Sequence, residues 1–163
     1  MQEKPYVGVV GSGTCDRSSR AYQLALEVGR LIAQKGGTLI CGGLYGVMEA
    51  AARGAKQAGG TTVGILPGRQ RSEQNAYLDV SIATGMGDAR NLVNVLSSDV
   101  IIAISGGPGT LSEIALALKN GKHVVGLETW HFDAPDFDTS ALYVAAGSPS
   151  EAVEKAFERA GNH

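Results

Sequence analysis

The sequence is poor in cysteine, and this limits both its chemistry and its compartment. Among 163 residues only Cys15 and Cys41 are cysteines, and neither belongs to a CxxC or a Cys/His group with metal-ligand spacing. This scarcity argues against a zinc site and against a disulfide-rich secreted scaffold, and no other metal site is indicated. Isolated cysteines fit a reducing compartment, so we expect a cytoplasmic protein.

An excess of basic residues and long apolar segments are also absent. The 14 Lys and Arg residues are outnumbered by 16 Asp and Glu residues, which gives a net charge of -2. The chain therefore lacks the basic footprint that DNA or RNA binding normally needs, and we expect no nucleic acid partner. No segment reaches the roughly 18 apolar residues of a membrane span, and the first residues lack the arrangement of a signal peptide. We expect no membrane association.

Glycine, in contrast, is abundant. The chain holds 23 glycines, about twice the usual share. Because glycine adopts positive φ and lets backbone approach a ligand closely, this number predicts several functional turns. The length and the 44% share of hydrophobic residues are typical of one compact domain, which we expect to span residues 1–163.

Short β-rich runs alternate with segments whose apolar residues recur at helical spacing. We predict strands at residues 6–10, 38–41, 61–66, 78–83, 100–104, 123–127 and 142–145, and a loop at 69–75. Helices are predicted at 18–35, 47–57, 88–96 and 110–119, and after Ser148, which has the pattern of an N-cap. This alternation predicts a Rossmann-like, doubly wound α/β sheet, mainly parallel, with six or seven strands and helices on both faces.

Glycine-rich turns follow three of the predicted strands. In a doubly wound sheet the ligand lies outside the carboxyl ends of the strands, where the strand order reverses. All three turns fall at that edge, so we predict that it binds a small phosphate-bearing ligand. The predicted binding residues are Gly11, Ser12 and Gly13 after the first strand, Gly42, Gly43 and Gly46 after the second, and Gly106, Gly107, Gly109 and Thr110 after the fifth.

The third turn is the most informative, because it runs into a predicted helix. Backbone N–H groups at Gly106, Gly107 and Gly109, together with the positive end of that helix near Thr110, would form an anion site. The alternative is a tight strand-to-helix turn with no ligand. Glu113 likewise has two interpretations: it faces the ligand, or it completes a capping box with Thr110.

Several cofactor classes are disfavoured by the residues at this edge. Position 16 is Asp16 rather than the third glycine of a dinucleotide fingerprint, and no acid ends the second strand, so NAD is not expected. There is no GxxxxGK[ST] motif for a Walker-type NTPase. No lysine directly follows a strand, which argues against a pyridoxal phosphate enzyme.

Arg90 is the cation that we expect at the site. It falls in the first turn of a predicted helix, where the dipole disfavours a basic residue, so its presence suggests a function. The alternative is a surface arginine paired with Asp88 or Asp99. In a 3-2-1-4-5-6 strand order the fourth strand borders the first, and this would bring Arg90 and Glu113 to the crevice beside Gly11. Trp130 and Phe132 could stack on a ring or anchor their own loop.

Four segments together resemble a known superfamily. They are GG-x-x-GVM at 42–48, GILPG at 64–68, Ala89-Arg90-Asn91, and GGPGTLSE at 106–113, of which the last is the most specific. They resemble the superfamily of the Lonely Guy cytokinin-activating phosphoribohydrolases and the molybdenum cofactor carrier proteins. Its members have often been labelled lysine decarboxylases, a label that the placement of the lysines in this chain does not support.

Similarity to the hydrolases implies cleavage of the N-glycosidic bond of a nucleoside 5′-monophosphate, with Arg90 and Glu113 as catalytic residues. Those enzymes usually have Pro before the Gly pair and Arg-Lys in the preceding helix, whereas this chain has Ser105 and Arg90-Asn91. The pattern resembles the carrier-like branch more closely. We therefore favour binding of a nucleotide or molybdenum cofactor as ligand over catalysis, with no cofactor required. The resemblance also implies a homo-oligomer, a dimer or tetramer, for which the helix at 110–119 is a candidate contact.

Overall fold

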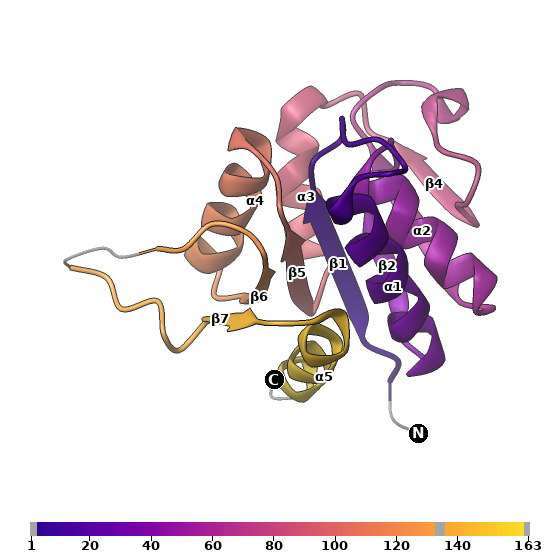
Figure 1. Cartoon of the computed structure of the whole chain (residues 1–163). Helices are drawn as coiled ribbons and strands as arrows, with labels where there is room; N and C mark the ends of the chain where they lie inside the picture. The colour runs from indigo at the N-terminus through magenta and orange to yellow at the C-terminus, as the bar shows by residue number, and fades with distance from the viewer. Residues whose placement is uncertain (1–2, 133–135, 162–163) are drawn as a thin grey trace.

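A computed structural model describes residues 3–132 and 136–161 of the chain (Figure 1). Its centre is a seven-stranded sheet in the order β4-β3-β2-β1-β5-β6-β7, and every neighbouring pair is parallel. The predicted doubly wound α/β fold is confirmed. The strands are β1 Tyr6–Gly11, β2 Thr38–Cys41, β3 Thr61–Leu66, β4 Val80–Ala83, β5 Val100–Ile104, β6 His123–Leu127 and β7 Tyr143–Ala146.

Helices cover both faces of the sheet. Helices α1, α2 and α5 pack on one face, and α3 and α4 pack on the other, each layer enclosing its own apolar cluster. The helices are α1 Arg20–Gln34, α2 Val47–Gln57, α3 Arg90–Leu96, α4 Pro108–Lys119 and α5 Pro149–Ala160, with short 3-10 turns at Arg71–Glu73 and Gly87–Ala89. Among the described residues no helix is long and apolar enough to cross a membrane.

Local sequence determines where several elements begin. The Ser148 side chain caps α5 by accepting from the Glu151 N–H at 3.2 Å, and the Glu151 carboxylate accepts from the Gly147 N–H at 2.7 Å. This is the predicted capping arrangement. Strand β5 is fully buried between β1 and β6, in keeping with its continuous apolar run. The 69–75 connection forms no strand or α-helix but holds the short turn at Arg71–Glu73.

The predicted position of the fourth strand is wrong. Strand β4 pairs with β3 at the edge of the sheet, and β5 takes the place beside β1. The chain keeps adding strands in one direction from β1 to β4, and only then does α3 cross the opposite face to start β5. The alternating exposure of β4, against the complete burial of β5, is what an edge strand requires.

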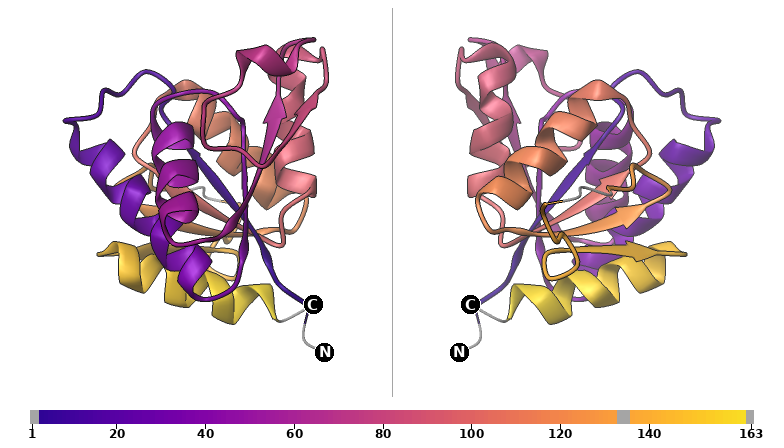
Figure 2. Two further views of the ribbon diagram at one scale, coloured as in Figure 1. Left: turned by 90° about the vertical axis from the view of Figure 1, so that its right-hand side faces the viewer. Right: turned by 90° about the vertical axis from the view of Figure 1, so that its left-hand side faces the viewer.

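The reversal of direction defines one end of the molecule. Strands β1 and β5 are parallel neighbours. The strands that follow β1 in the chain lie on one side of this pair, and those that follow β5 lie on the other side. The loops that follow the strands gather above their carboxyl ends, while the start of β1 and the end of α5 lie at the other end (Figures 1 and 2). A crevice at such a point is where ligands bind in open α/β sheets.

Candidate functional site

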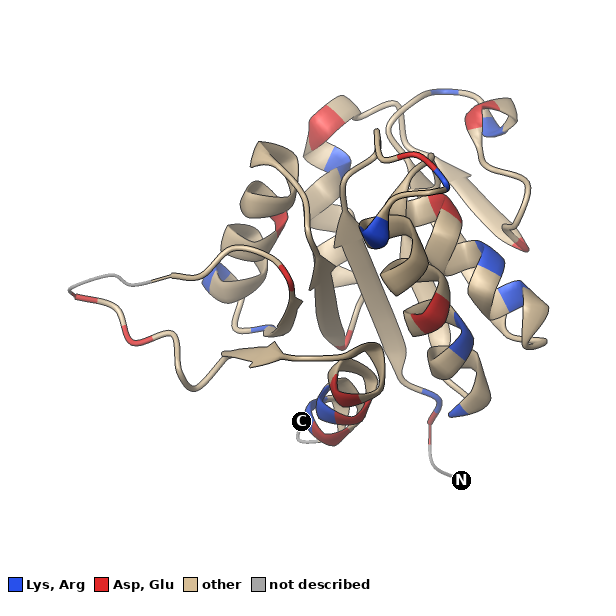
Figure 3. Cartoon of the chain, viewed as in Figure 1, with Lys and Arg blue, Asp and Glu red and all other residues tan. Residues whose placement is uncertain are grey.

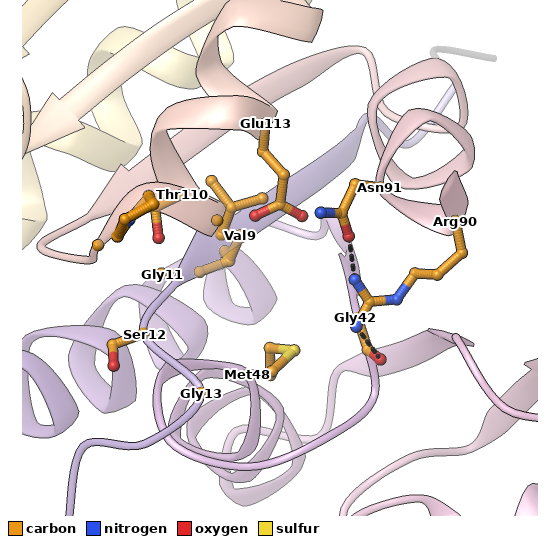
Figure 4. Close-up of a pocket in the computed structure, with 14 residues that line it drawn as sticks. Val9, Gly11, Ser12, Gly13, Gly42, Met48, Arg90, Asn91, Thr110 and Glu113 are labelled. Atoms are coloured by element: carbon orange, nitrogen blue, oxygen red, sulfur yellow. Dashed lines mark hydrogen bonds between the residues drawn. The ribbon is translucent and has the colours of Figure 1, made fainter. Parts of the chain in front are cut away.

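A cavity of about 260 Å³ lies at the carboxyl ends of β1, β2 and β5 (Figure 4). It is lined by nine of the residues predicted for the site, which are Gly11, Ser12, Gly13, Gly42, Arg90, Gly107, Gly109, Thr110 and Glu113. The other lining residues are Val9, Val10, Met48, Asn91 and Pro108. Residues far apart in the sequence therefore meet at the crevice, although the strand order is not the predicted one.

The start of α4 leaves backbone open to the cavity. Gly107 is the N-cap of this helix, and a Cβ added at Gly107 or Gly109 would meet nothing within 4 Å. Gly106 is different: its φ is +94°, and a Cβ there would lie 2.1 Å from the Thr110 hydroxyl oxygen. Glycine is needed at 106 to make the turn, whereas at 107 and 109 it leaves room for a ligand.

The loop after β6 holds this turn in place through hydrogen bonds to its backbone carbonyls. The Thr129 hydroxyl donates to the Ser105 carbonyl at 2.6 Å, and the Trp130 indole N–H donates to the Gly107 carbonyl at 3.3 Å. The Tyr143 hydroxyl in turn donates to the Trp130 carbonyl at 2.6 Å. Of the two roles considered for Trp130, the structure thus shows an anchoring contact, and the contact is made to the cavity-lining turn itself.

The first two glycine-rich turns pack against each other and against α2. The Val47 N–H donates to the Ser12 carbonyl at 2.9 Å, so the loop after β1 lies over the start of α2. Gly46, with φ of +63°, permits this contact because a Cβ would lie 2.3 Å from the same carbonyl oxygen. Gly43, Gly46 and Gly106 do not line the cavity. They shape the turns whose other residues do.

Arg90 is buried at the start of α3, with 8% of its surface exposed. Its guanidinium donates to the Asn91 side-chain oxygen and, at 3.3 Å, to the Gly42 carbonyl, and its Nε is buried without a partner among the described residues (Figure 4). Burial lowers the pKa of Arg90, while the nearby Glu113, Cys41 and Asp88 act against that shift. The alternative of an exposed surface arginine is therefore wrong.

Glu113 faces the same cavity from α4. Helix α4 begins at Pro108, two residues earlier than predicted, so Thr110 lies inside the helix and the proposed capping box does not form. Burial raises the pKa of Glu113 to about 7, against the lowering effects of Arg90 and of the Asn94 amide. A carboxyl group with this pKa can hold or release a proton near neutral pH.

Sequence reasoning missed the apolar floor of the cavity. Val9 and Val10 are part of β1, and Met48 is the second residue of α2, with its sulfur close to Gly42. A rule that the first turn of a helix after a glycine-rich loop contributes to the site would have found Met48. These three residues add apolar surface to a cavity whose other side chains are mostly polar.

The fold and the cavity together define a Rossmann-like α/β protein with a glycine-rich pocket at the switch point of its sheet. The model of the SLOG cluster4 family matches residues 4–156, and the chain belongs to that family. The predicted superfamily resemblance is thereby confirmed, since the similar proteins include both of the groups named above.

Two solved structures and one enzyme illustrate this similarity. The molybdenum cofactor binding protein of Rippkaea orientalis is 40% identical with a TM-score of 0.84, over 97% of this chain and 98% of that protein. The molybdenum cofactor carrier protein of Chlamydomonas reinhardtii is 41% identical with a TM-score of 0.83, over 96% and 98%. Cytokinin riboside 5′-monophosphate phosphoribohydrolase of Mycobacterium tuberculosis is 37% identical over 68% of this chain, which spans 65% of that enzyme's length.

Proposed function

We propose that this chain binds the molybdenum cofactor, a phosphate-bearing pterin, in the cavity and acts as its carrier. The observation that carries the proposal is the open backbone at Gly107 and Gly109 at the start of a twelve-residue helix, beside a buried arginine. Peptide N–H groups and the helix dipole favour an anion at that position. The similarity to cofactor-binding proteins over almost the whole chain supports the choice of ligand.

The cavity residues fit such a molecule. The phosphate would lie against Gly107, Gly109 and Thr110, where no side chain obstructs the backbone. The Arg90 Nε has no partner among the described residues, so a bound anion could satisfy it. The apolar surface of Val9 and Met48 would face the ring system. Here the cofactor is cargo, and the chain's task is to bind it and keep it from water.

Retention of the cofactor tests the proposal. The protein is incubated without oxygen with cofactor released from a molybdoenzyme, separated by gel filtration, and assayed for pterin and molybdenum. We expect both to co-elute with the wild-type protein and to be lost from Gly107→Val. Absence of pterin from the wild-type fraction, at concentrations where a known carrier retains it, would rule the carrier function out.

Phosphoribohydrolase activity is the second candidate, supported by the placement of Glu113 and Arg90 at one cavity. In that reaction water adds to C1′ of a nucleoside 5′-monophosphate and the base leaves with a proton, giving free base and ribose 5-phosphate. Glu113 would stabilise the sugar cation and position the water, and Arg90 would orient the substrate. Asn91 stands where the hydrolases usually have lysine, and this favours the carrier role.

A panel of nucleoside 5′-monophosphates separates the two candidates. Release of base by the wild-type protein, abolished in Glu113→Gln with nearly unchanged affinity, would establish the hydrolase. Turnover that persists in Glu113→Gln would remove Glu113 from the catalytic role. Thermal stabilisation by the nucleotides without base release is the result expected of a carrier.

We also infer a homo-oligomer, formed through an apolar face on β4 and α3. Five large apolar side chains within a short segment are between 37% and 52% exposed: Val80, Ile82, Met86, Leu92 and Leu96. The strand register places Val80 and Ile82 on the sheet face that α3 and α4 cover. Between positions 80 and 98 the only charged residues are Asp88 and the buried Arg90, so two copies could meet there without repulsion (Figure 3).

A further inference from the structure

Asn94 is a buried amide that makes no side-chain hydrogen bond of ordinary geometry to the described residues. It lies in α3 with 2% of its surface exposed, and among the described residues no group meets its side-chain oxygen or nitrogen with ordinary hydrogen-bond geometry. Leaving a buried polar atom unpaired costs on the order of 1–3 kcal/mol. An apolar residue would avoid that cost, so the amide at this position calls for a function.

The position of Asn94 links it to Glu113. Asn94 follows Arg90 by four residues, so the two side chains share one face of α3, and α3 packs on α4, which carries Glu113. The Asn94 amide lies near enough to the carboxyl group to lower the pKa of Glu113. It does not line the cavity itself. Asn94 therefore acts on a ligand only through Glu113.

An amide is suited to a partner that changes protonation state. Its NH₂ group can donate to an ionised carboxylate, and its carbonyl oxygen can accept from a protonated carboxyl. An aliphatic side chain could do neither, and a second carboxylate would repel the ionised form. The other titratable groups near Glu113 are Arg90 from α3 and the thiol of Cys41 at the end of β2.

We propose that Asn94 is a positioning residue that holds the Glu113 carboxyl group toward the cavity as its hydrogen-bond partner. The amide donates to the ionised form and accepts from the neutral one, so Glu113 keeps a partner in either state. The inference applies to a carrier and to a hydrolase alike, because in both Glu113 is the acid that faces the ligand.

The test uses ligand-free protein, so a failure to find the ligand does not affect it. The titration of Glu113 is followed by the ¹³C shift of its side-chain carboxyl carbon, assigned by its loss in Glu113→Gln. We expect a midpoint near the pKa of about 7 in the wild-type protein. Asn94→Leu, which is similar in size but apolar, should raise the proton affinity of Glu113 about tenfold.

Ser98→Ala is the matched control. Ser98 is 1% exposed near the end of the same helix, and its hydroxyl donates to the Asn94 backbone carbonyl at 2.8 Å. Its removal disturbs the same segment without removing the amide, so the Glu113 midpoint should stay within about twofold of the wild-type proton affinity. An Asn94→Leu midpoint equal to that of wild type would overturn the proposal.

A second measurement needs no substitution at Asn94 and covers the case in which Asn94→Leu does not fold. In the wild-type protein the ¹⁵N shift of the Asn94 side chain should follow pH with the same midpoint as Glu113. In Glu113→Gln this dependence should disappear. A side-chain shift that is independent of pH between 5 and 9, about two units on either side of that midpoint, would refute the coupling.

Discussion

Glu113 is a carboxyl group placed where its charged form is unfavourable. Its folded pKa, raised to about 7 by burial, lies above the ordinary pKa of 4.5 that applies to the unfolded chain. In the folded protein the carboxyl group therefore stays protonated up to a higher pH than in the unfolded chain. The contribution of Glu113 to the free energy of unfolding is therefore fully present below the unfolded pKa of 4.5. It is lost as the pH rises through the folded pKa of about 7.

Glu113→Gln should therefore remove a pH dependence of stability. Relative to this variant, the free energy of unfolding of the wild-type protein should fall by about 2–3 kcal/mol between pH 4.5 and pH 8, because a buried carboxylate must then be charged. Urea unfolding of both proteins at a series of pH values measures the difference. Parallel stability curves across this range would show that Glu113 does not titrate as described.

At the scale of single residues, the sequence predicted the polar members of the cavity better than the apolar ones. Arg90 was predicted from a basic residue in the first turn of a helix, where the dipole disfavours it. Glu113 could not be separated from a helix cap, because the choice depends on whether α4 starts at Thr110 or at Pro108. Asn94 carried no local signal, because its closeness to Glu113 depends on how α3 packs on α4.

At the scale of secondary structure elements, the turn between β5 and α4 contains two kinds of glycine. One is required by the backbone conformation of the turn, and the other leaves open space beside the cavity. Gly106 has a positive φ and a Cβ there would clash with the Thr110 side chain, whereas Gly107 has an ordinary negative φ of -106° and open surroundings. The two neighbours should therefore respond in opposite ways to substitution.

Gly107→Val should fold and lose its ligand. Its cost in stability should not exceed about 1 kcal/mol, because the new side chain points into open space at an N-cap. Gly106→Ala is the contrast and should lose about 1–3 kcal/mol of stability through its backbone conformation. Thermal unfolding and retention of pterin check both effects. Full retention by a folded Gly107→Val protein would contradict the proposed phosphate position.

The elements themselves were predictable because their periods and turn residues agree. Five strands begin at their predicted residues, whereas β4 begins two residues later and β7 one residue later than predicted. Their order in the sheet was less accessible. Whether β4 belongs to the first or the second half depends on where the chain changes direction, and the short 69–75 connection carries no pattern that reveals it.

For the whole molecule, the apolar face on β4 and α3 determines how copies would associate. The outward side of α4, the contact suggested by the sequence, carries Ser112, Ala115 and Lys119, which are exposed and mostly polar or small. The larger apolar side chains lie on the neighbouring face instead.

Leu96→Glu should convert the oligomer into monomers, because a two-fold contact would bring together two buried charges without partners. Sedimentation equilibrium at micromolar concentrations measures the mass, with Ala115→Glu as the control on α4. Dissociation by Ala115→Glu, with Leu96→Glu still assembled, would move the contact to α4.

The neighbouring strands β1 and β5 join two halves of the sheet that the chain connects only once, through α3. The cavity draws residues from both halves, with Gly11–Gly13 and Gly42 on one side and Gly107–Glu113 on the other. A molecule bound there would contact both halves and would raise the free energy needed to separate β1 from β5. Amide hydrogens deep in β1 and β5, well away from the loops, would then exchange more slowly, so that occupancy could be measured in the centre of the sheet.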